Sequence, residues 1–118
     1  MFGLAIWDER NKKLILARDR MGVKPLYYKL EDGRLFFASE IRALVAAANE
    51  KPELDPVALN LFLRYRYTPA PLTLVNGIKK LAPGTRLIVE DGSARVERWW
   101  NFKPVPFDPV QRDRKSVV

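Results

Sequence analysis

One stretch of the sequence decides how this chain folds: Ala17-Arg18-Asp19-Arg20-Met21-Gly22-Val23-Lys24-Pro25-Leu26-Tyr27-Tyr28. It predicts the end of one β-strand, a tight turn at Gly22 and a new strand that starts after Pro25. The Arg18-Asp19-Arg20 triplet could hold a carboxylate between two guanidinium groups, which either fixes a loop or binds an anion. At the end of a buried strand, the structural salt bridge is the favoured interpretation. A phosphate loop is not indicated, because the glycine is single and no helix opens after it.

Composition limits the chemistry that the chain can perform. Its 118 residues suffice for one small domain, and 47% of them are apolar. The sequence has no cysteine and no histidine, which excludes a Cys-His or Ser-His-Asp mechanism and a cysteine-type zinc site. No apolar run has the length of a membrane span and nothing resembles a signal peptide, so we expect a cytoplasmic protein without membrane contact.

The charge of the chain is basic but dispersed. A net charge of +7 results from 21 Lys and Arg against 14 Asp and Glu, and the tight basic pairs are Lys12-Lys13 and Lys79-Lys80. Scattered charges favour a solvated surface over a nucleic-acid-binding stripe. No nucleic-acid partner is therefore expected, and a small basic nucleic-acid-binding module is the alternative of another class.

The apolar pattern predicts six strands, over residues 2–7, 14–17, 26–28, 35–38, 85–89 and 95–100. The first two are apolar on both faces and are expected to be buried on both. Asp32-Gly33 and Asp91-Gly92 each separate two strands, and this dipeptide suits a hairpin turn that needs two positive φ angles. The opening hairpin would expose apolar surface if its neighbours were missing, which predicts poor solubility or a homodimer.

Two helices are expected between the strands. Ser39 is placed as the cap of the first, with Glu40 in its first turn. Asp55 is placed as the cap of the second, with Pro56 at the first helical position and Pro69 and Pro71 ending the element. The expected inner faces are Ile41, Leu44, Val45 and Ala48 in the first helix, and Leu59, Phe62 and Leu63 in the second, with a hydrophobic staple between Leu54 and Leu59. Strands, two helices and more strands indicate an α+β fold.

Several polar and aromatic residues have a functional and a structural interpretation. Ser39-Glu40 could be a nucleophile beside a carboxylate, but a helix cap is favoured because an apolar helical face follows. Lys79-Lys80 could contact phosphate but is more typical of a solvated loop, and Trp99-Trp100 more often covers a strand end than stacks on a ligand. Self-cleavage at Gly84-Thr85 or Gly92-Ser93 is disfavoured, because both pairs lie in turn-like sequence. We predict no catalytic, substrate-binding, cofactor-binding or metal-binding residue in this chain.

Six ordered motifs resemble the glutaminase domain of glutamine-hydrolysing asparagine synthetases. The opening stretch is similar to the family's ARDRxGxKPLYY segment, and Met1-Phe2-Gly3-Leu4-Ala5-Ile6-Trp7-Asp8 to its GMFAFAIWD strand. FASEIRAL resembles FASEIKAL, GIKKLAPG resembles GIxKLPPG and RWW resembles RYW. The sixth match joins Glu53-Leu54-Asp55-Pro56 with Tyr67-Thr68-Pro69-Ala70-Pro71-Leu72-Thr73-Leu74, which is similar to ELDP…YVPAPxTL.

The resemblance implies a class II, N-terminal-nucleophile amidotransferase with an αββα sandwich fold. In that family an N-terminal cysteine attacks glutamine, a thioester forms and ammonia leaves. A second domain then uses ATP and Mg²⁺ to activate aspartate. L-glutamine, L-aspartate and ATP are accordingly the expected partners of the parent enzyme. By this reading residues 1–100 are the C-terminal part of the glutaminase domain, and residues 101–112 are a linker towards the ATP-binding domain.

The sequence also departs from the family. The cysteine, a glutamine-binding arginine, an Asn-Gly-Glu loop and a substrate-binding aspartate all precede the GMF strand there, and none has a counterpart here. The chain is therefore expected to be an internal fragment of the synthetase, without cofactors and inactive by itself. A fragment of a related amidotransferase with another acceptor is the alternative within the class. Residues 113–118 match the translation of a common sequencing adapter, and we expect them to be a non-native tail.

Overall fold

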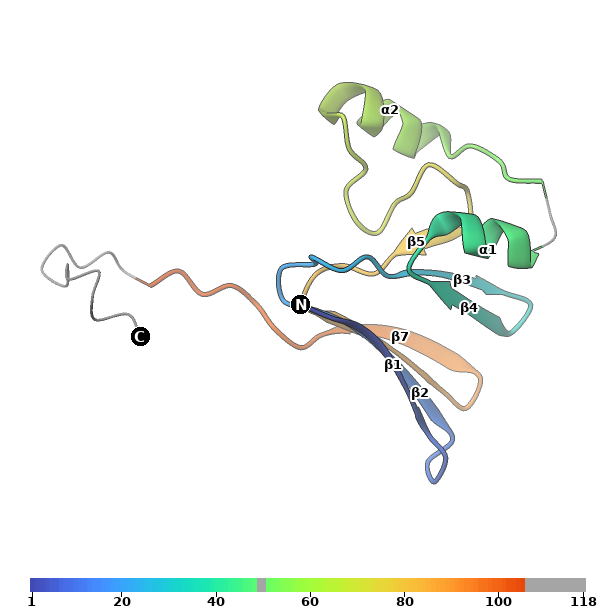
Figure 1. The fold of residues 1–118 in the computed structure, drawn as a ribbon, viewed down its shortest axis with the longest axis vertical. Helices are drawn as coiled ribbons and strands as arrows, with labels where there is room; N and C mark the ends of the chain where they lie inside the picture. The colour runs from blue at the N-terminus through green and yellow to red at the C-terminus, as the bar shows by residue number, and fades with distance from the viewer. Residues whose placement is uncertain (49–50, 106–118) are drawn as a thin grey trace, which may run out of the picture.

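The computed structural model describes residues 1–48 and 51–105, which form an α+β arrangement of two antiparallel sheets and two helices (Figure 1). This confirms the predicted α+β class. The four-stranded sheet has the order β1 (Gly3–Asp8), β2 (Lys13–Arg18), β6 (Thr85–Glu90) and β7 (Ser93–Arg98). The three-stranded sheet has the order β4 (Arg34–Ala38), β3 (Tyr27–Glu31) and β5 (Ile78–Lys80).

Both predicted hairpin turns are confirmed. Asp32 and Gly33 join β3 to β4 with φ angles of 46° and 72°, and Asp91 and Gly92 join β6 to β7 with 49° and 72°. Two consecutive positive φ angles match the right-handed twist of the strands that the turn connects. The Asp-Gly dipeptides therefore set the register of both hairpins.

The core lies between the inner faces of the two sheets. Leu16 of β2 is directly opposite Leu87 of β6, and both side chains are buried. Leu26, Tyr28 and Leu81 pack against them from the three-stranded sheet and its connections. Burial of these side chains in one cluster is what holds the two sheets together.

Strand β1 does not fulfil the prediction of burial on both faces. None of its six residues is buried, and the side chains of Ile6 and Trp7, which point to opposite faces, are 53% and 54% exposed. The reason is its place at the edge of the sheet, where β2 is its one neighbouring strand among the described residues. An apolar run thus indicates a strand, but its burial depends on whether other elements lie against its two faces.

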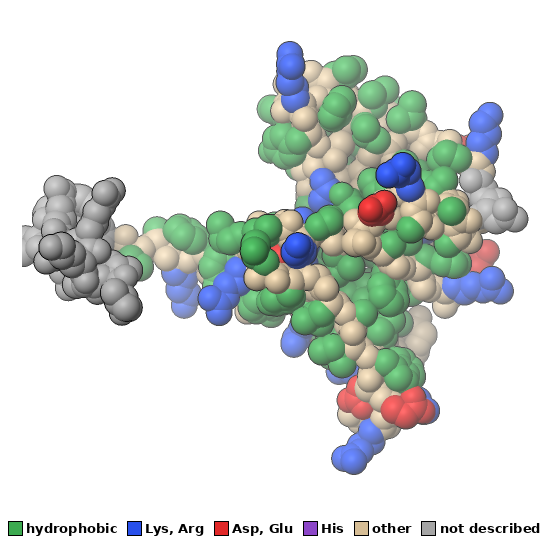
Figure 2. Space-filling view, in the orientation of Figure 1, with side chains coloured by type: hydrophobic (Ala, Val, Ile, Leu, Met, Phe, Trp, Pro, Cys, Tyr) green, Lys and Arg blue, Asp and Glu red, His purple; other side chains and the backbone are tan. Residues whose placement is uncertain are grey.

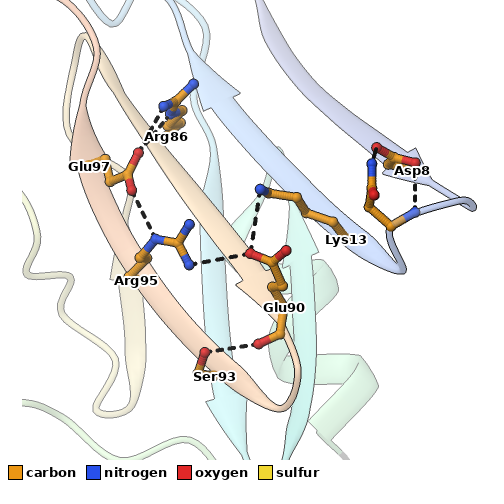
Figure 3. A network of polar contacts seen from close by, with 8 residues as sticks. Asp8, Lys13, Arg86, Glu90, Ser93, Arg95 and Glu97 are labelled. Carbon is orange, nitrogen blue, oxygen red and sulfur yellow. Dashed lines mark hydrogen bonds and ion pairs between the residues drawn. The ribbon is translucent and has the colours of Figure 1, made fainter.

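The outer face of β6 and β7 is covered by ion pairs rather than by another layer (Figure 3). Glu90 lies 3.5 Å from Arg95 and 3.4 Å from Lys13 of β2, and Glu97 accepts hydrogen bonds from Arg86 and Arg95 at 2.9 Å each. Both hydrogen bonds lower the pKa of Glu97, and the bond from Arg95 has the larger effect. Alternating charges cover the sheet so well that Ile88, which lies on this same face, is only 2% exposed.

Helix α1 (Ile41–Ala48) begins later than predicted. Its first residue is Ile41, so Glu40 directly precedes the helix and Ser39 lies one residue further out. The placement of Ser39 as the cap and of Glu40 in the first turn is therefore wrong. The predicted inner face is confirmed around Leu44, which is 2% exposed, while Ile41, Val45 and Ala48 are half-buried.

Helix α2 (Pro56–Tyr65) confirms its predicted start but not its end or its inner face. The Asp55 carboxylate accepts the N–H groups of Val57 and Ala58 at 2.9 and 3.0 Å, and Pro56 is the first helical residue. The helix ends at Tyr65, because Arg66 adopts a left-handed conformation and donates its N–H to the Phe62 carbonyl at 2.7 Å. The prediction that Pro69 and Pro71 end this helix is wrong.

The inner face of α2 also differs from the prediction. Ala58 is its buried residue, whereas Leu63 is 72% exposed and Phe62 39%. Leu59 is half-buried and Leu54 is 63% exposed. Figure 1 shows α2 standing apart from both sheets, and Phe62 lines an open pocket with Tyr27 and Ile41 instead of packing in a closed core.

Three further boundaries differ from the sequence prediction. Strand β5 (Ile78–Lys80) replaces the expected loop at Lys79-Lys80, and β7 ends at Arg98 instead of continuing to Trp100. Residues 101–105 are exposed and form neither helix nor strand. The rest of the proposed linker, from residue 106, and the proposed tail at residues 113–118 lie outside the described residues.

Candidate functional site

The loop that connects β2 to β3 is the most tightly bonded polar part of the described chain. It runs from Arg18 to Lys24 and crosses from the four-stranded to the three-stranded sheet. Arg18 and Asp19 at its start are 7% and 4% exposed. Charged side chains are buried this deeply only when their polar atoms have partners, so the partners define what the loop does.

The Asp19 carboxylate is enclosed by backbone N–H groups. It accepts hydrogen bonds from Lys24 and Val23 at 3.0 Å each, from Met21 at 3.2 Å and from Phe2 at 3.3 Å. These bonds, with the Lys24 N–H the strongest contributor, lower the pKa of Asp19 to about 2. The carboxylate is thus held in its charged form and closes the loop around itself.

The Arg18 guanidinium is bonded in the complementary way, to three backbone carbonyl groups. Its Nε donates to Lys24 at 2.8 Å, its Nη2 to Gly22 at 2.7 Å and its Nη1 to Leu81 at 2.6 Å. Leu81 follows β5, so this one side chain ties the loop to a segment 63 residues away in sequence. The planar guanidinium suits this task because its donors diverge in a fixed fork.

The sequence predicted a structural salt bridge within Arg18-Asp19-Arg20. The structural role of these residues holds, but their partners differ from the prediction. Among the described residues, Asp19 forms no ion pair with Arg18 or Arg20, and Arg20 is exposed. Adjacent residues at a strand end point to opposite sides, which separates the two charged groups. Each of them finds backbone atoms instead.

Two glycines allow the neighbouring segments to approach this loop. A Cβ at Gly22, whose φ is +69°, would lie 2.6 Å from Cγ of Pro83. A Cβ at Gly84, whose φ is +63°, would lie 2.8 Å from the carbonyl oxygen of Trp100. Both positions therefore combine a left-handed backbone with a contact that leaves no space for a side chain.

The segment after β7 completes the arrangement. Gly84 donates its N–H to the Asp19 carbonyl at 3.0 Å and accepts N–H groups from Trp99 and Trp100 at 3.0 and 3.1 Å. The Trp99 ring stacks on Phe2 with 6.0 Å between centroids, which supports the interpretation of the tryptophan pair as the cover of a strand end. We call residues 18–24, 81–85 and 99–100 together the sheet junction.

The other candidate hydroxyl groups are bonded to nearby backbone. Thr85 donates to the Ala82 carbonyl at 2.7 Å, and Ser93 donates to the Glu90 carbonyl at 2.9 Å. Neither hydroxyl faces a base, so the geometry favours the turn interpretation at both sites. Ser39 is exposed beside Glu40, whose carboxylate lies 3.9 Å from Arg42.

The environment of Lys80 differs from the solvated loop that the sequence predicted. It lies on β5, is half-buried, and its ammonium group donates to the Thr68 carbonyl at 2.9 Å. Burial, and then the nearby positive charge of Arg18, lower its pKa. The expectation of a solvated pair is wrong for Lys80 and fits only Lys79, which is exposed. The one sequence signal available was alternation, which places adjacent lysines on opposite faces of a strand.

Within residues 1–48 and 51–105, no three His, Cys, Asp or Glu side chains gather where a metal ion could bind. The same ranges include no helix that is long and apolar enough to span a membrane. In the sheet junction, Arg18 and Asp19 bond to the backbone. The arrangement can fix two sheets relative to each other.

A family model described as "Glutamine amidotransferase domain" matches residues 1–100. The chain belongs to this family of glutamine amidotransferase domains.

The curated relatives define the branch of the family. The chain is 37% identical over 108 residues to asparagine synthetase [glutamine-hydrolyzing] 1 of Bacillus subtilis (strain 168), which covers 89% of this chain and 17% of the relative. It is 34% identical over 104 residues to asparagine synthetase 3 of the same organism, with 87% and 17% covered. Amidase chry2 of Gibberella zeae is 35% identical over 104 residues, with 86% and 15% covered. The chain thus spans about a sixth of the length of these relatives.

Proposed function

We propose that this chain is the scaffold portion of the glutaminase domain of a glutamine-hydrolysing asparagine synthetase. The parent enzyme would amidate L-aspartate with ammonia from L-glutamine in an ATP-dependent reaction. The observation that carries the proposal is the 37% identity over 108 residues to a synthetase of this kind, within a family match over residues 1–100. Because the reaction uses ATP, we place the parent enzyme in the cytoplasm.

In that domain this chain would hold the two sheets in position, and it would not supply the group that reacts with glutamine. Hydrolysis of a glutamine side chain through a thioester needs a thiolate, and this sequence has no cysteine. We infer that the two antiparallel sheets are the two β-layers of an αββα sandwich and that the sheet junction fixes their relative position. The nucleophile and the groups that bind glutamine would come from other parts of the parent chain.

The described residues give no support for an ATP site or a Mg²⁺ site in this chain. The described residues include no cluster of three metal-binding side chains, and the single glycine of the Arg18–Lys24 loop is followed by a strand instead of a helix. The proposal therefore assigns both to another part of the parent enzyme.

A chimera tests the proposed function directly. Residues 1–100 would replace the matching segment of asparagine synthetase 1 of Bacillus subtilis, and asparagine formation would be measured with glutamine and, separately, with ammonium as nitrogen source. The proposal predicts that glutamine supports the reaction. Loss of activity with both sources would contradict the assignment, and so would glutamate release from glutamine by the isolated 118-residue chain.

An acceptor other than aspartate is the second candidate, because not every relative at this level of identity is named an asparagine synthetase. Amidase chry2 carries a different name at a similar identity, 35% over 104 residues. A glutaminase scaffold does not contact the acceptor, so this part of the chain fits either enzyme. Assaying the parent enzyme with aspartate and with other carboxylates separates the two candidates, because only a synthetase prefers aspartate.

A further inference from the structure

The chain bends sharply where it leaves strand β7. Trp99 and Trp100 both donate their N–H groups to the carbonyl oxygen of Gly84, at 3.0 and 3.1 Å. Successive N–H groups of an extended strand point in opposite directions, so two that meet at one oxygen require a bend between them. This bend follows the end of β7 at Arg98, and Figure 1 shows residues 101–105 running away from both sheets.

Gly84 provides the space for this bend and ties it to the loop between the sheets. It is buried with a φ of +63°, and a Cβ there would lie 2.8 Å from the carbonyl oxygen of Trp100 and 3.2 Å from its indole ring. On its other side, Gly84 donates its N–H to the Asp19 carbonyl at 3.0 Å. One residue therefore connects the Arg18–Lys24 loop with the segment that leaves the four-stranded sheet.

The side chain of Trp99 holds the same segment. Its Nε1 donates to the Thr85 carbonyl at 3.3 Å, and its ring stacks on that of Phe2. Both tryptophans are half-buried, whereas residues 101–105 are exposed. The change from held to exposed chain thus falls directly after Trp100, which is also the last residue of the family match.

We propose that Gly84 and Trp99 are positioning residues that set the direction in which the chain passes from the glutaminase part of the parent enzyme to the part that binds the acceptor. The inference rests on the proposed function, in which ammonia from glutamine must reach an acceptor bound elsewhere in the parent chain. A bend tied through Gly84 to Asp19 transmits the position of the two sheets to the segment that follows them.

Loosening this bend should separate the two half-reactions without stopping either. Ammonia released between misaligned parts escapes into water and is protonated, so it is lost to the acceptor. Ammonium supplied in excess from solution reaches the acceptor as before, because it does not depend on the alignment. The ratio of glutamate released to asparagine formed therefore reports the role of the bend, and a general loss of stability does not imitate a rise in this ratio.

The chimera that carries residues 1–100 is suited to this test. Gly84→Ala places a Cβ against Trp100 and should raise the ratio about tenfold, because a displacement of this kind misplaces one site relative to the other. Glutamate release and synthesis from ammonium should stay near those of the unmodified chimera. Gly92→Ala is the matched control, since Gly92 has a similar φ of +72° but nothing within 4 Å of the added Cβ, and it should leave the ratio unchanged.

A second pair of variants decides the matter if Gly84→Ala does not fold. Trp99→Ala removes the stack on Phe2 and the bond to Thr85, and it should raise the ratio in the same way. Trp99→Phe keeps a ring against Phe2 and should restore most of the coupling. An unchanged ratio in both Gly84→Ala and Trp99→Ala overturns the inference. Loss of glutamate release in both overturns it as well, because the bend would then only hold the glutaminase fold together.

The unmodified chimera distinguishes this inference from the function on which it rests. If it forms no asparagine from glutamine before any further substitution, the proposed function is contradicted and the inference falls with it. If it does form asparagine from glutamine and the variants keep its ratio, the inference alone is overturned.

Discussion

The Arg18–Lys24 loop and helix α2 reverse the usual relation between polarity and burial. The loop begins with two charged side chains that are 7% and 4% exposed, whereas the apolar Leu63 of α2 is 72% exposed. The loop is buried because backbone groups from three segments satisfy its charges. The helix stays largely exposed because Phe62 faces only an open pocket, which it shares with Tyr27 and Ile41, and Leu63 is not among the residues that line it. Figure 2 shows apolar side chains gathered over this part of the molecule. Polarity alone therefore does not decide burial; the available partners do.

Removing the Asp19 carboxylate should cause the largest loss of stability. Asp19→Ala would leave four backbone N–H groups without their acceptor, three of them within the loop itself. We expect the cooperative thermal transition, followed by circular dichroism, to disappear. Arg20→Ala is the matched control in the same loop, since Arg20 is exposed, and it should unfold like the wild type.

Acid should act on the same carboxylate. The pKa of Asp19 is about 2 in the folded chain against an ordinary value of 3.8, so the folded state favours the charged form. The resulting stability is present above pH 3.8 and is lost as the pH falls towards 2. Denaturant midpoints measured between pH 5 and 2 should decline through this window. Asp19→Asn should weaken that decline, and an unchanged pH profile in this variant would contradict the assignment.

The close contact at Gly22 should have the next largest effect. Gly22→Ala adds a Cβ 2.6 Å from Pro83 at a φ of +69° and should cost about 2–3 kcal/mol. Gly33→Ala has a similar φ of +72° but open space around it, and should cost about 1 kcal/mol. Urea unfolding of both variants separates the clash from the backbone strain. Equal losses would show that Pro83 does not confine Gly22.

The cap of α2 should matter less. Asp55→Ala removes the acceptor for two N–H groups at the start of the helix and should cost about 1 kcal/mol. Urea unfolding followed at 222 nm measures the change, with Asp55→Asn as the control that keeps a capping oxygen. If Asp55→Asn lost as much stability as Asp55→Ala, the negative charge of Asp55 and not its capping oxygen would stabilise the start of α2.

The smallest effect is expected on the exposed side of α2. Leu63→Ala removes an apolar side chain that is 72% exposed and should change the stability by less than about 0.5 kcal/mol. Leu44→Ala in α1, at 2% exposure, should cost about 2–5 kcal/mol. Similar losses in the two variants would show that α2 is covered in solution.

The features predicted correctly from the sequence were those with a local cause. The Asp-Gly turns and the Asp55 cap depend on residues within three positions of one another, and all of them are confirmed. The errors had causes that no pattern in the sequence shows. The partners of Arg18 include the carbonyl group of Leu81, which no pattern near Arg18 reveals. Helix α2 ends because Arg66 adopts a left-handed conformation, and the sequence does not reveal this conformation in a residue other than glycine.

Amide hydrogen exchange of the full chain tests most directly the claim that the buried polar loop, and not α2, holds the fold. The N–H groups of Val23, Lys24 and Gly84, which bond to Asp19, should exchange only through global unfolding. The amides of α2 should exchange at least tenfold faster, by local opening. Equal protection of α2 and the loop, or faster exchange in the loop, would contradict the account.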